Sequence, residues 1–95
     1  MSYNIIVKYF DWDKDKNTKL KKERSISFEE IAIAIKEEGI LDIVDNPSGN
    51  FPNQKVYVIK INQIVYYVPF VEDAEKILLK TIIPSRKLRK KYLRK

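Results

Sequence analysis

The sequence contains no cysteine and no histidine among its 95 residues. Without cysteine the chain has no disulfides, thiol nucleophiles or thiolate metal sites, which is typical of a reducing compartment. Without histidine it lacks the usual general base near neutral pH, and histidine-based triads and histidine metal sites are excluded. Any catalysis must therefore use Lys, Arg, Tyr, Asp or Glu.

Long apolar runs are also missing. The run at 64–71 is far shorter than the ~20 residues that a membrane helix needs. Residues 1–10 are followed at once by charges, unlike a secretion signal. We therefore expect a cytoplasmic protein with no membrane partner. A hydrophobic content of 44% and the absence of repeats or linkers predict a single domain, 1–95, with its own core.

The positive charge is concentrated at the C-terminus. Residues 85–95 carry seven Lys or Arg and no acid, whereas the other twelve basic residues face thirteen acids. A local excess of cations on an otherwise balanced domain is typical of polyanion binding, because each cation that neutralises a phosphate releases counterions. Nucleic acid is the first partner that the charge pattern indicates.

The hydrophobic patterning predicts an α+β fold. We expect an antiparallel sheet of four to five strands, two N-terminal helices packed on it, and a basic C-terminal helix. Asp13 is expected to cap the first helix, 13–24. Ser27 and Glu30 form the capping-box pattern that begins the second, which Gly39 should end as a left-handed residue.

Alternating and β-branched residues predict the strands. Asn62-Gln63 is expected to form a tight hairpin turn, and Pro69 indicates a bulge, a strand end or an edge position. Pro84 should end the last strand, after which Ser85 begins a helix anchored by Leu88 and Tyr92. The strands are expected at 4–10, 40–44, 55–61, 64–71 and 76–83, with a turn at 45–50.

Three stretches of the chain carry a pattern of residues: Phe10-Asp11-Trp12-Asp13 with Lys16-Asn17, Ile26-Ser27-Phe28-Glu29-Glu30, and Ile82-Ile83-Pro84-Ser85-Arg86-Lys87 with the later Tyr92. In this order they resemble the BrnT family of toxins. The resemblance spans nearly the whole chain and depends on the ordered set rather than on any one motif. It implies a RelE-like fold, ribonuclease activity in a type II toxin-antitoxin system, and a cognate antitoxin that binds the toxin directly. The sequence departs from the family pattern at Glu23-Arg24-Ser25 and at Thr81, where a basic residue is expected.

RNA can be cut without a metal or another cofactor because its own 2′-hydroxyl attacks the neighbouring phosphorus. The protein must hold the phosphate, stabilise the developing charge and move two protons. Arg86 is the first catalytic candidate, as a phosphate ligand. Lys87 is the second, although its charge could serve only to steer RNA. Tyr92 either packs as a core anchor, transfers a proton with a pKa lowered by nearby cations, or stacks on a base.

The other basic candidates are expected to bind RNA. Lys16 could contact the substrate backbone or be one more solvated charge on a polar helix. Tyr66 and Tyr67 must face opposite sides of their strand, so one is expected to be exposed and either to stack on a base or to be half-buried. The acids are interpreted as turn residues, and no metal site is expected. The RNA-binding candidates are Lys16, Lys80, Arg89, Lys90, Lys91 and Arg94.

Three functions of different classes fit these features. The first is a metal-independent endoribonuclease toxin that acts on messenger RNA, on the ribosome or free of it, and is neutralised by an antitoxin. The second is a non-catalytic nucleic-acid-binding module, which would bind RNA with strong salt dependence and leave it uncut. The third is an interaction protein whose basic C-terminus docks an acidic partner. The family resemblance favours the first.

Overall fold

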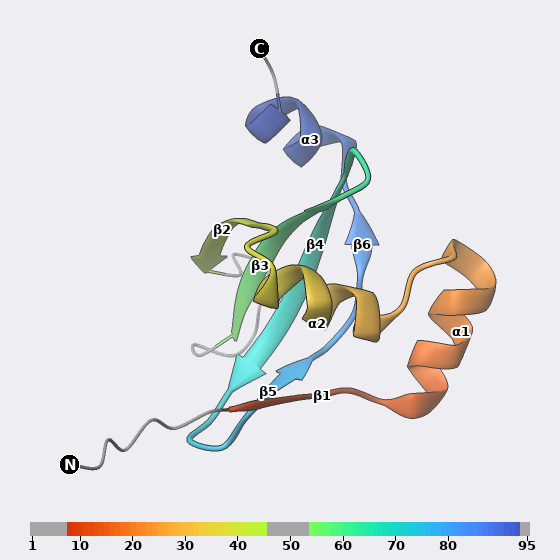
Figure 1. The fold of residues 1–95 in the computed structure, drawn as a ribbon, viewed down its shortest axis with the longest axis vertical. Coiled ribbons are helices and arrows are strands. Elements are labelled where there is room, and N and C mark those ends of the chain that lie inside the picture. Colours follow the sequence, from red (N-terminus) through yellow and green to blue (C-terminus); the bar gives the residue numbers. More distant parts are fainter. Residues whose placement is uncertain (1–7, 46–53, 94–95) are drawn as a thin grey trace.

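The computed structural model describes residues 8–45 and 54–93, which form a six-stranded sheet with three helices (Figure 1). The predicted α+β class is confirmed. Among the described residues, no helix has the length and apolar character needed to span a membrane. The elements in chain order are β1 (Tyr9–Asp11), α1 (Lys14–Arg24), α2 (Phe28–Lys36), β2 (Ile40–Asp45), β3 (Gln54–Ile61), β4 (Ile64–Glu72), β5 (Lys76–Leu79), β6 (Ile83–Pro84) and α3 (Arg86–Leu93).

The strand order is β1-β5-β4-β3-β2. β5 and β6 both pair with the same edge of β4, β5 with residues 70–72 and β6 with residues 66–67. All pairs are antiparallel except β1 with β5, which run parallel with Phe10 opposite Ile77. The prediction of an antiparallel sheet of four to five strands is therefore wrong: the sheet is mixed and has six. Short links force antiparallel pairing only between sequence neighbours, and two helices and the central hairpin separate β1 from β5. Residues 4–7 of the predicted first strand lie outside the described residues.

The central hairpin has the predicted turn. Asn62 and Gln63 both adopt left-handed backbone conformations, with φ of 50° and 70°. Two consecutive left-handed residues are the signature of the type I′ turn, whose twist matches that of the flanking strands. β3 and β4 consequently pair along their whole length, from Ile61 opposite Ile64 to Gln54 opposite Val71.

The predicted strand at 76–83 is broken between β5 and β6, and Pro69 explains the break. Pro69 is buried inside the central strand β4, not at an edge or an end. Its carbonyl accepts a 2.8 Å hydrogen bond from the Lys80 amide. In an antiparallel strand the N–H and C=O of one residue point to the same side, so Pro69 has no donor to offer residues 80–82. The ladder stops there and resumes where Tyr67 pairs with Ile83.

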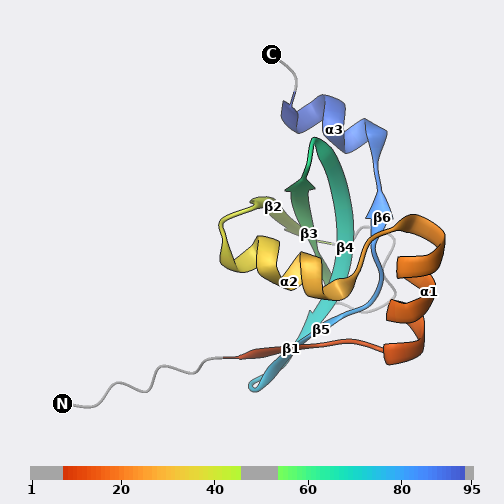
Figure 2. The ribbon, with the colours of Figure 1, turned by 45° about the vertical axis from the view of Figure 1, so that its right-hand side comes forward.

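The two N-terminal helices begin as predicted but pack differently. Asp13 caps α1, and Ser27 caps α2 in a complete capping box with Glu30. α2 lies across the face of β3 and β4, whereas α1 stands beside the sheet (Figures 1 and 2). The prediction that both helices cover the sheet is therefore wrong. α1 buries only Asn17 and Leu20, which is too little apolar surface for a sheet-covering helix.

Asn17 joins the two helices. Its Oδ1 accepts a 2.8 Å hydrogen bond from the backbone amide of Phe28, and its Nδ2 donates to Glu29 at 2.8 Å. The Trp12 ring stacks on the Phe28 ring with 5.7 Å between centroids. α1 is thus held by this polar clamp, by the aromatic pair at its start, by the buried Leu20 and by a 2.8 Å hydrogen bond from Arg24 to the Ile82 carbonyl.

Gly39 does not supply the left-handed residue that was predicted to end α2. Glu38 does, with φ of 63°, while the φ of Gly39 is not positive. Gly39 is needed for another reason: a Cβ there would lie 2.9 Å from the Ala34 carbonyl oxygen, which already accepts the Gly39 amide hydrogen bond at 2.7 Å. The close approach of two backbone segments leaves no room for a side chain.

The core fills the space between α2 and the sheet. Tyr57 stacks on Phe70 with 3.9 Å between ring centroids. Tyr66 belongs to the same cluster, and only 7% of its surface is exposed. Tyr67 faces the other side of the sheet and is half-buried, which matches the half-buried alternative rather than an exposed tyrosine. The fully buried residues of this core include Phe28, Ile31, Ile59, Val68, Leu79 and Ile82.

Candidate nucleic-acid interface

α3 lies at the end of the sheet, beyond the β3–β4 turn (Figures 1 and 2). Ser85 begins it as predicted, because its hydroxyl accepts a hydrogen bond from the Leu88 amide at 3.2 Å. The Ser85 amide donates to the Val65 carbonyl at 2.9 Å, and Arg89 Nε donates to the Gln63 carbonyl at 2.8 Å. No residue of α3 is fully buried, so polar contacts carry much of its attachment.

The helix presents two different stripes. Leu88 and Tyr92, four residues apart, share one stripe, and Tyr92 donates a 2.5 Å hydrogen bond to Oδ2 of Asp42 on the edge strand β2. Residues 86, 89, 90 and 93 recur at three- and four-residue spacing and share the other. The basic residues of α3 are therefore divided between different surroundings.

A cleft runs along the second stripe, and we call it the α3 cleft. It has a volume of about 520 Å³, and Arg86, Arg89 and Lys90 contribute its cations. A second hollow of about 510 Å³ continues it past Arg89 and Lys90 to Leu93. The described residues that line the α3 cleft include no acid; they are Gln63, Ile64, Val65, Pro84, Ser85, Arg86, Arg89 and Lys90.

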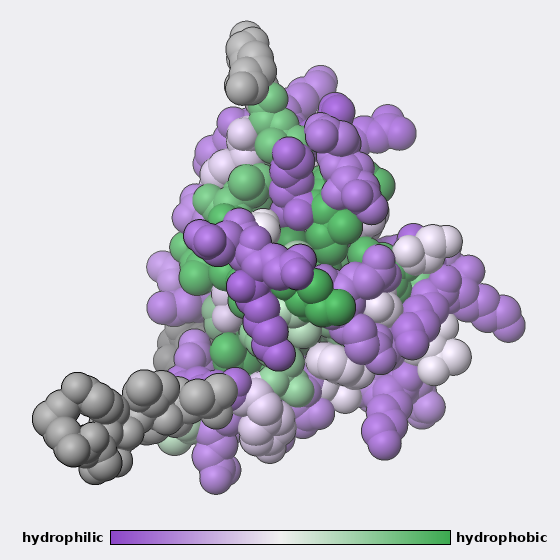
Figure 3. Space-filling model, viewed as in Figure 1, coloured by the Kyte–Doolittle hydropathy of each residue, from purple (hydrophilic) through white to green (hydrophobic). Residues whose placement is uncertain are grey.

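The floor of the α3 cleft is apolar. Ile64 is 43% exposed and Pro84 is also exposed, although both are apolar. The neighbouring surface between α2 and α3, which includes a separate hollow beside α2, also shows hydrophobic atoms below the hydrophilic atoms of α3 (Figure 3). A cationic rim over an apolar floor suits a ligand that combines negative charge with flat apolar surface.

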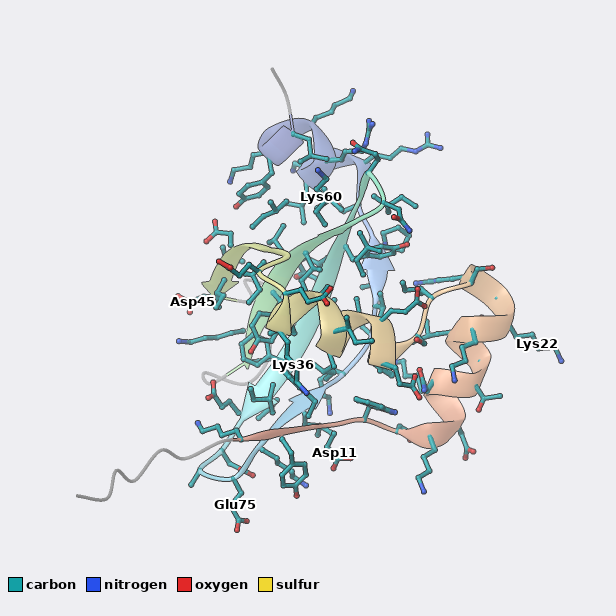
Figure 4. The ribbon with its side chains drawn as sticks, viewed as in Figure 1. Asp11, Lys22, Lys36, Asp45, Lys60 and Glu75 are labelled. Carbon is teal, nitrogen blue, oxygen red and sulfur yellow. The ribbon has the colours of Figure 1, made fainter. Side chains whose placement is uncertain are left out.

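A hollow of about 350 Å³ beside α2 has a different character. Its lining includes Glu30 and Glu37, together with the apolar Ile33 and Ile61. Lys60 from β3 also reaches it, at the end of the sheet nearest α3 (Figure 4). Because two carboxylates repel phosphate, this hollow is less suited to an anion than the α3 cleft is.

The pKa of the Tyr92 phenol is raised, whereas the role in proton transfer required a lowered pKa. Its hydrogen bond to Asp42 raises the pKa of the Tyr92 phenol, and the same bond lowers the pKa of the Asp42 carboxyl. The Lys91 ammonium lies 5.4 Å from the centroid of the Tyr92 ring. The hydroxyl therefore stays protonated and engaged with Asp42, outside the α3 cleft.

The remaining candidates are dispersed. Lys87 and Lys91 are exposed on α3 but do not line the cleft. Lys16 is exposed on α1, and Lys80 is exposed between β5 and β6. Lys22 of α1 points away from the sheet (Figure 4). Arg94 lies outside the described residues.

No family model, no curated protein and no solved structure matches this chain. Its function must be inferred from the α3 cleft itself. Among the described residues, no three Asp or Glu side chains gather as a metal site would require. The groups available in the cleft are two guanidinium ions, one ammonium ion, a hydroxyl and an amide, from Arg86, Arg89, Lys90, Ser85 and Gln63.

Sequence reasoning missed two contributors to the cleft. Gln63 was assigned only to a turn, and Ile64 only to a strand. A signal for Ile64 exists in the sequence, because an isoleucine directly after a two-residue turn stands at the end of the sheet, where covering elements are scarce. Only the tertiary position of α3 brings both residues beside Arg86 and Arg89.

Proposed function

We propose that this chain binds RNA in the α3 cleft. The observation that supports this most directly is the convergence of Arg86, Arg89 and Lys90 on one cleft with no acid in its described lining. Arg offers a planar fork that matches phosphate oxygens, and Lys adds a point charge. An apolar floor beside these cations suits the bases that accompany the phosphates.

We further propose that the bound RNA is cut, as the BrnT resemblance implies. Arg86 is the phosphate ligand: it lies where β6 passes into α3, at the mouth of the cleft. As the 2′-hydroxyl attacks phosphorus, charge grows on the phosphate oxygens and the Arg86 guanidinium stabilises it. Arginine does not lose its proton in proteins, so Lys90 is the cation in the cleft that donates a proton to the leaving 5′-oxygen, while solvent takes the proton of the attacking 2′-hydroxyl.

The biological setting follows from the same proposal. The chain acts as a RelE-like ribonuclease toxin of a type II toxin-antitoxin system, with messenger RNA as the substrate. The α+β fold with its basic C-terminal helix is compatible with this assignment. A cognate antitoxin that places acidic side chains against Arg89 and Lys90 would block the RNA site by direct competition.

The test compares three forms of the protein, expressed without a partner: the wild type, Arg86→Ala, and Lys36→Ala on the exposed face of α2. We expect the wild type and Lys36→Ala to arrest growth and cut a defined transcript. Loss of a ligand to the transition-state charge should lower the cleavage rate by roughly 10²–10³-fold in Arg86→Ala. A folded wild type that neither arrests growth nor cuts RNA would refute the enzyme proposal.

A second candidate is a non-catalytic RNA-binding module, and the position of Tyr92 favours it. The Tyr92 hydroxyl is engaged with Asp42 rather than directed into the cleft, which leaves Lys90 without a tyrosine partner for proton transfer. In that case the wild type should bind the transcript with strong salt dependence and return it intact after prolonged incubation.

A further inference from the structure

We propose that the α3 cleft receives one unstacked base, that Gln63 reads the edge of this base, and that the ligand is therefore unpaired RNA. This inference rests on the proposed RNA-binding function and extends it to the class of RNA. It arises from three properties of the cleft: an apolar floor, cations on one side only, and an amide side chain at its end.

The floor provides the surface for the base. Val65 also lines the cleft but is buried, with 1% of its surface exposed, so the accessible apolar surface of the floor comes from Ile64 and Pro84. Apolar side chains exposed at a cationic site are costly to leave in water, and covering them with a flat ring recovers that cost. A phosphate alone would leave the floor uncovered.

The arrangement of charge orients the nucleotide. The cations come from α3, whereas the floor comes from the start of β4 and from β6. A nucleotide can satisfy both only if its phosphates lie along α3 and its base turns toward the sheet. In a duplex the base faces are stacked on their neighbours and cannot reach such a floor, so pairing and binding exclude each other.

The size of the cleft agrees with a ligand of this class. About 520 Å³ lies within the range of roughly 300–1,000 Å³ that is typical of small-molecule pockets. The hollow beside α2 is smaller and carries Glu30 and Glu37, so it offers no second anionic subsite.

Gln63 is positioned to give base preference. Its left-handed backbone belongs to the hairpin turn, and its carbonyl is fixed by the hydrogen bond from Arg89. The side chain is exposed at the cleft and carries both a donor and an acceptor. A primary amide can pair with a base edge that presents the complementary groups, so Gln63 discriminates among bases while the cations bind every nucleotide.

The test uses short RNA with 2′-O-methyl groups, which cannot be cut because the attacking hydroxyl is blocked. We expect the single strand to bind at least tenfold more tightly than the same strand annealed to its complement. A single 2-aminopurine in the strand reports on stacking, since this base becomes more fluorescent when it leaves the stack. The described lining of the cleft contains no aromatic ring, so binding should increase the fluorescence.

Two variants locate the effect. Ile64→Ser should weaken single-strand binding about tenfold and abolish the fluorescence change without adding a charge beside the cations, whereas Ile43→Ser is a matched control, because Ile43 is 49% exposed on β2 away from the cleft. Gln63→Asn keeps a residue that tolerates the left-handed turn but shortens the amide. It should alter the ranking of strands that differ in one base while the salt dependence stays unchanged.

The outcomes separate the two proposals. Equal binding of single strand and duplex, or an unchanged 2-aminopurine signal on binding, overturns the base-binding inference and leaves RNA binding intact. Absence of binding to any RNA overturns both. If Gln63→Asn leaves the base ranking unchanged, Gln63 is not the residue that reads the base.

Discussion

The salt dependence of RNA binding measures how many cations of α3 face the ligand. The described part of α3 carries five basic residues, but only three of them line the cleft: Arg86, Arg89 and Lys90. If only these three neutralise phosphates, the plot of log K against log salt should have a slope of about −2, since single strands give roughly −0.7 per phosphate. Removing Lys90 should change the slope to about −1.4.

These slopes give clearly different losses of affinity. Between 50 and 200 mM salt, the wild type should lose roughly 20-fold in affinity and Lys90→Ala roughly 7-fold. If all five cations of α3 contacted phosphates, the wild type would lose on the order of 130-fold. The three cases differ by more than the error of a titration.

Fluorescence anisotropy of an uncleavable 2′-O-methyl strand provides the assay, with Lys36→Ala as the control for loss of one surface charge. The wild-type slope should be matched by Lys36→Ala and reduced by Lys90→Ala. A wild-type slope near −3.5, estimated as five contacts at about −0.7 each, would refute the reasoning. So would Lys87→Ala or Lys91→Ala variants that reduce the slope as much as Lys90→Ala.

Three further predictions concern stability. Asn17→Ala should cost about 1–3 kcal/mol in urea unfolding, because it leaves the buried Phe28 amide without its acceptor. Gly39→Ala should lower the urea midpoint because its Cβ meets the Ala34 carbonyl, whereas Glu38→Gly should raise it by relieving about 1 kcal/mol of left-handed strain. The wild type should exceed Tyr92→Phe in Tm by a constant margin between about pH 4 and 10.

The pH range of this constant Tm difference follows from the directions in which folding shifts the pKa values of Asp42 and Tyr92. The folded state lowers the pKa of Asp42 below its usual 3.8, so the stabilisation is present above that pH and is lost as pH falls through the folded pKa. It raises the pKa of Tyr92 above 10.0, so the stabilisation is present below pH 10 and is lost as pH rises through the folded pKa. If the Tm difference between the wild type and Tyr92→Phe does not shrink at low pH or at high pH, the Tyr92–Asp42 hydrogen bond does not have this role. If the urea midpoint of Asn17→Ala equals that of the wild type, the hydrogen bonds of Asn17 do not stabilise the fold.

Local signals in the sequence predicted local structure well. Ser27 and Glu30 marked the start of α2, and Asn62-Gln63 marked a two-residue hairpin, because caps and tight turns depend on residues a few positions apart. The parallel pairing of β1 with β5 was not predictable in this way, since nothing in residues 9–11 specifies a partner more than sixty positions away.

The candidate site was predicted in part. The charge of residues 85–95 correctly indicated a basic helix, but charge alone does not say which cations face a cleft. That division depends on the helix orientation, which is set by Tyr92 with Asp42 and by Arg89 with the Gln63 carbonyl. Both contacts join residues far apart in the chain, so neither leaves a pattern in the sequence.

Pro69 has a consequence for the cooperativity of unfolding. Because the ladder is interrupted between Lys80 and Ile83, β6 and α3 form a C-terminal arm beyond the buried Ile82, and the backbone of this arm joins the sheet through two residue pairs and a few polar contacts. We expect such a segment to open at a lower free energy than the central hairpin and to form a separate unfolding unit. A partner that captures the arm can therefore dismantle the cationic cleft while the sheet and α2 remain folded.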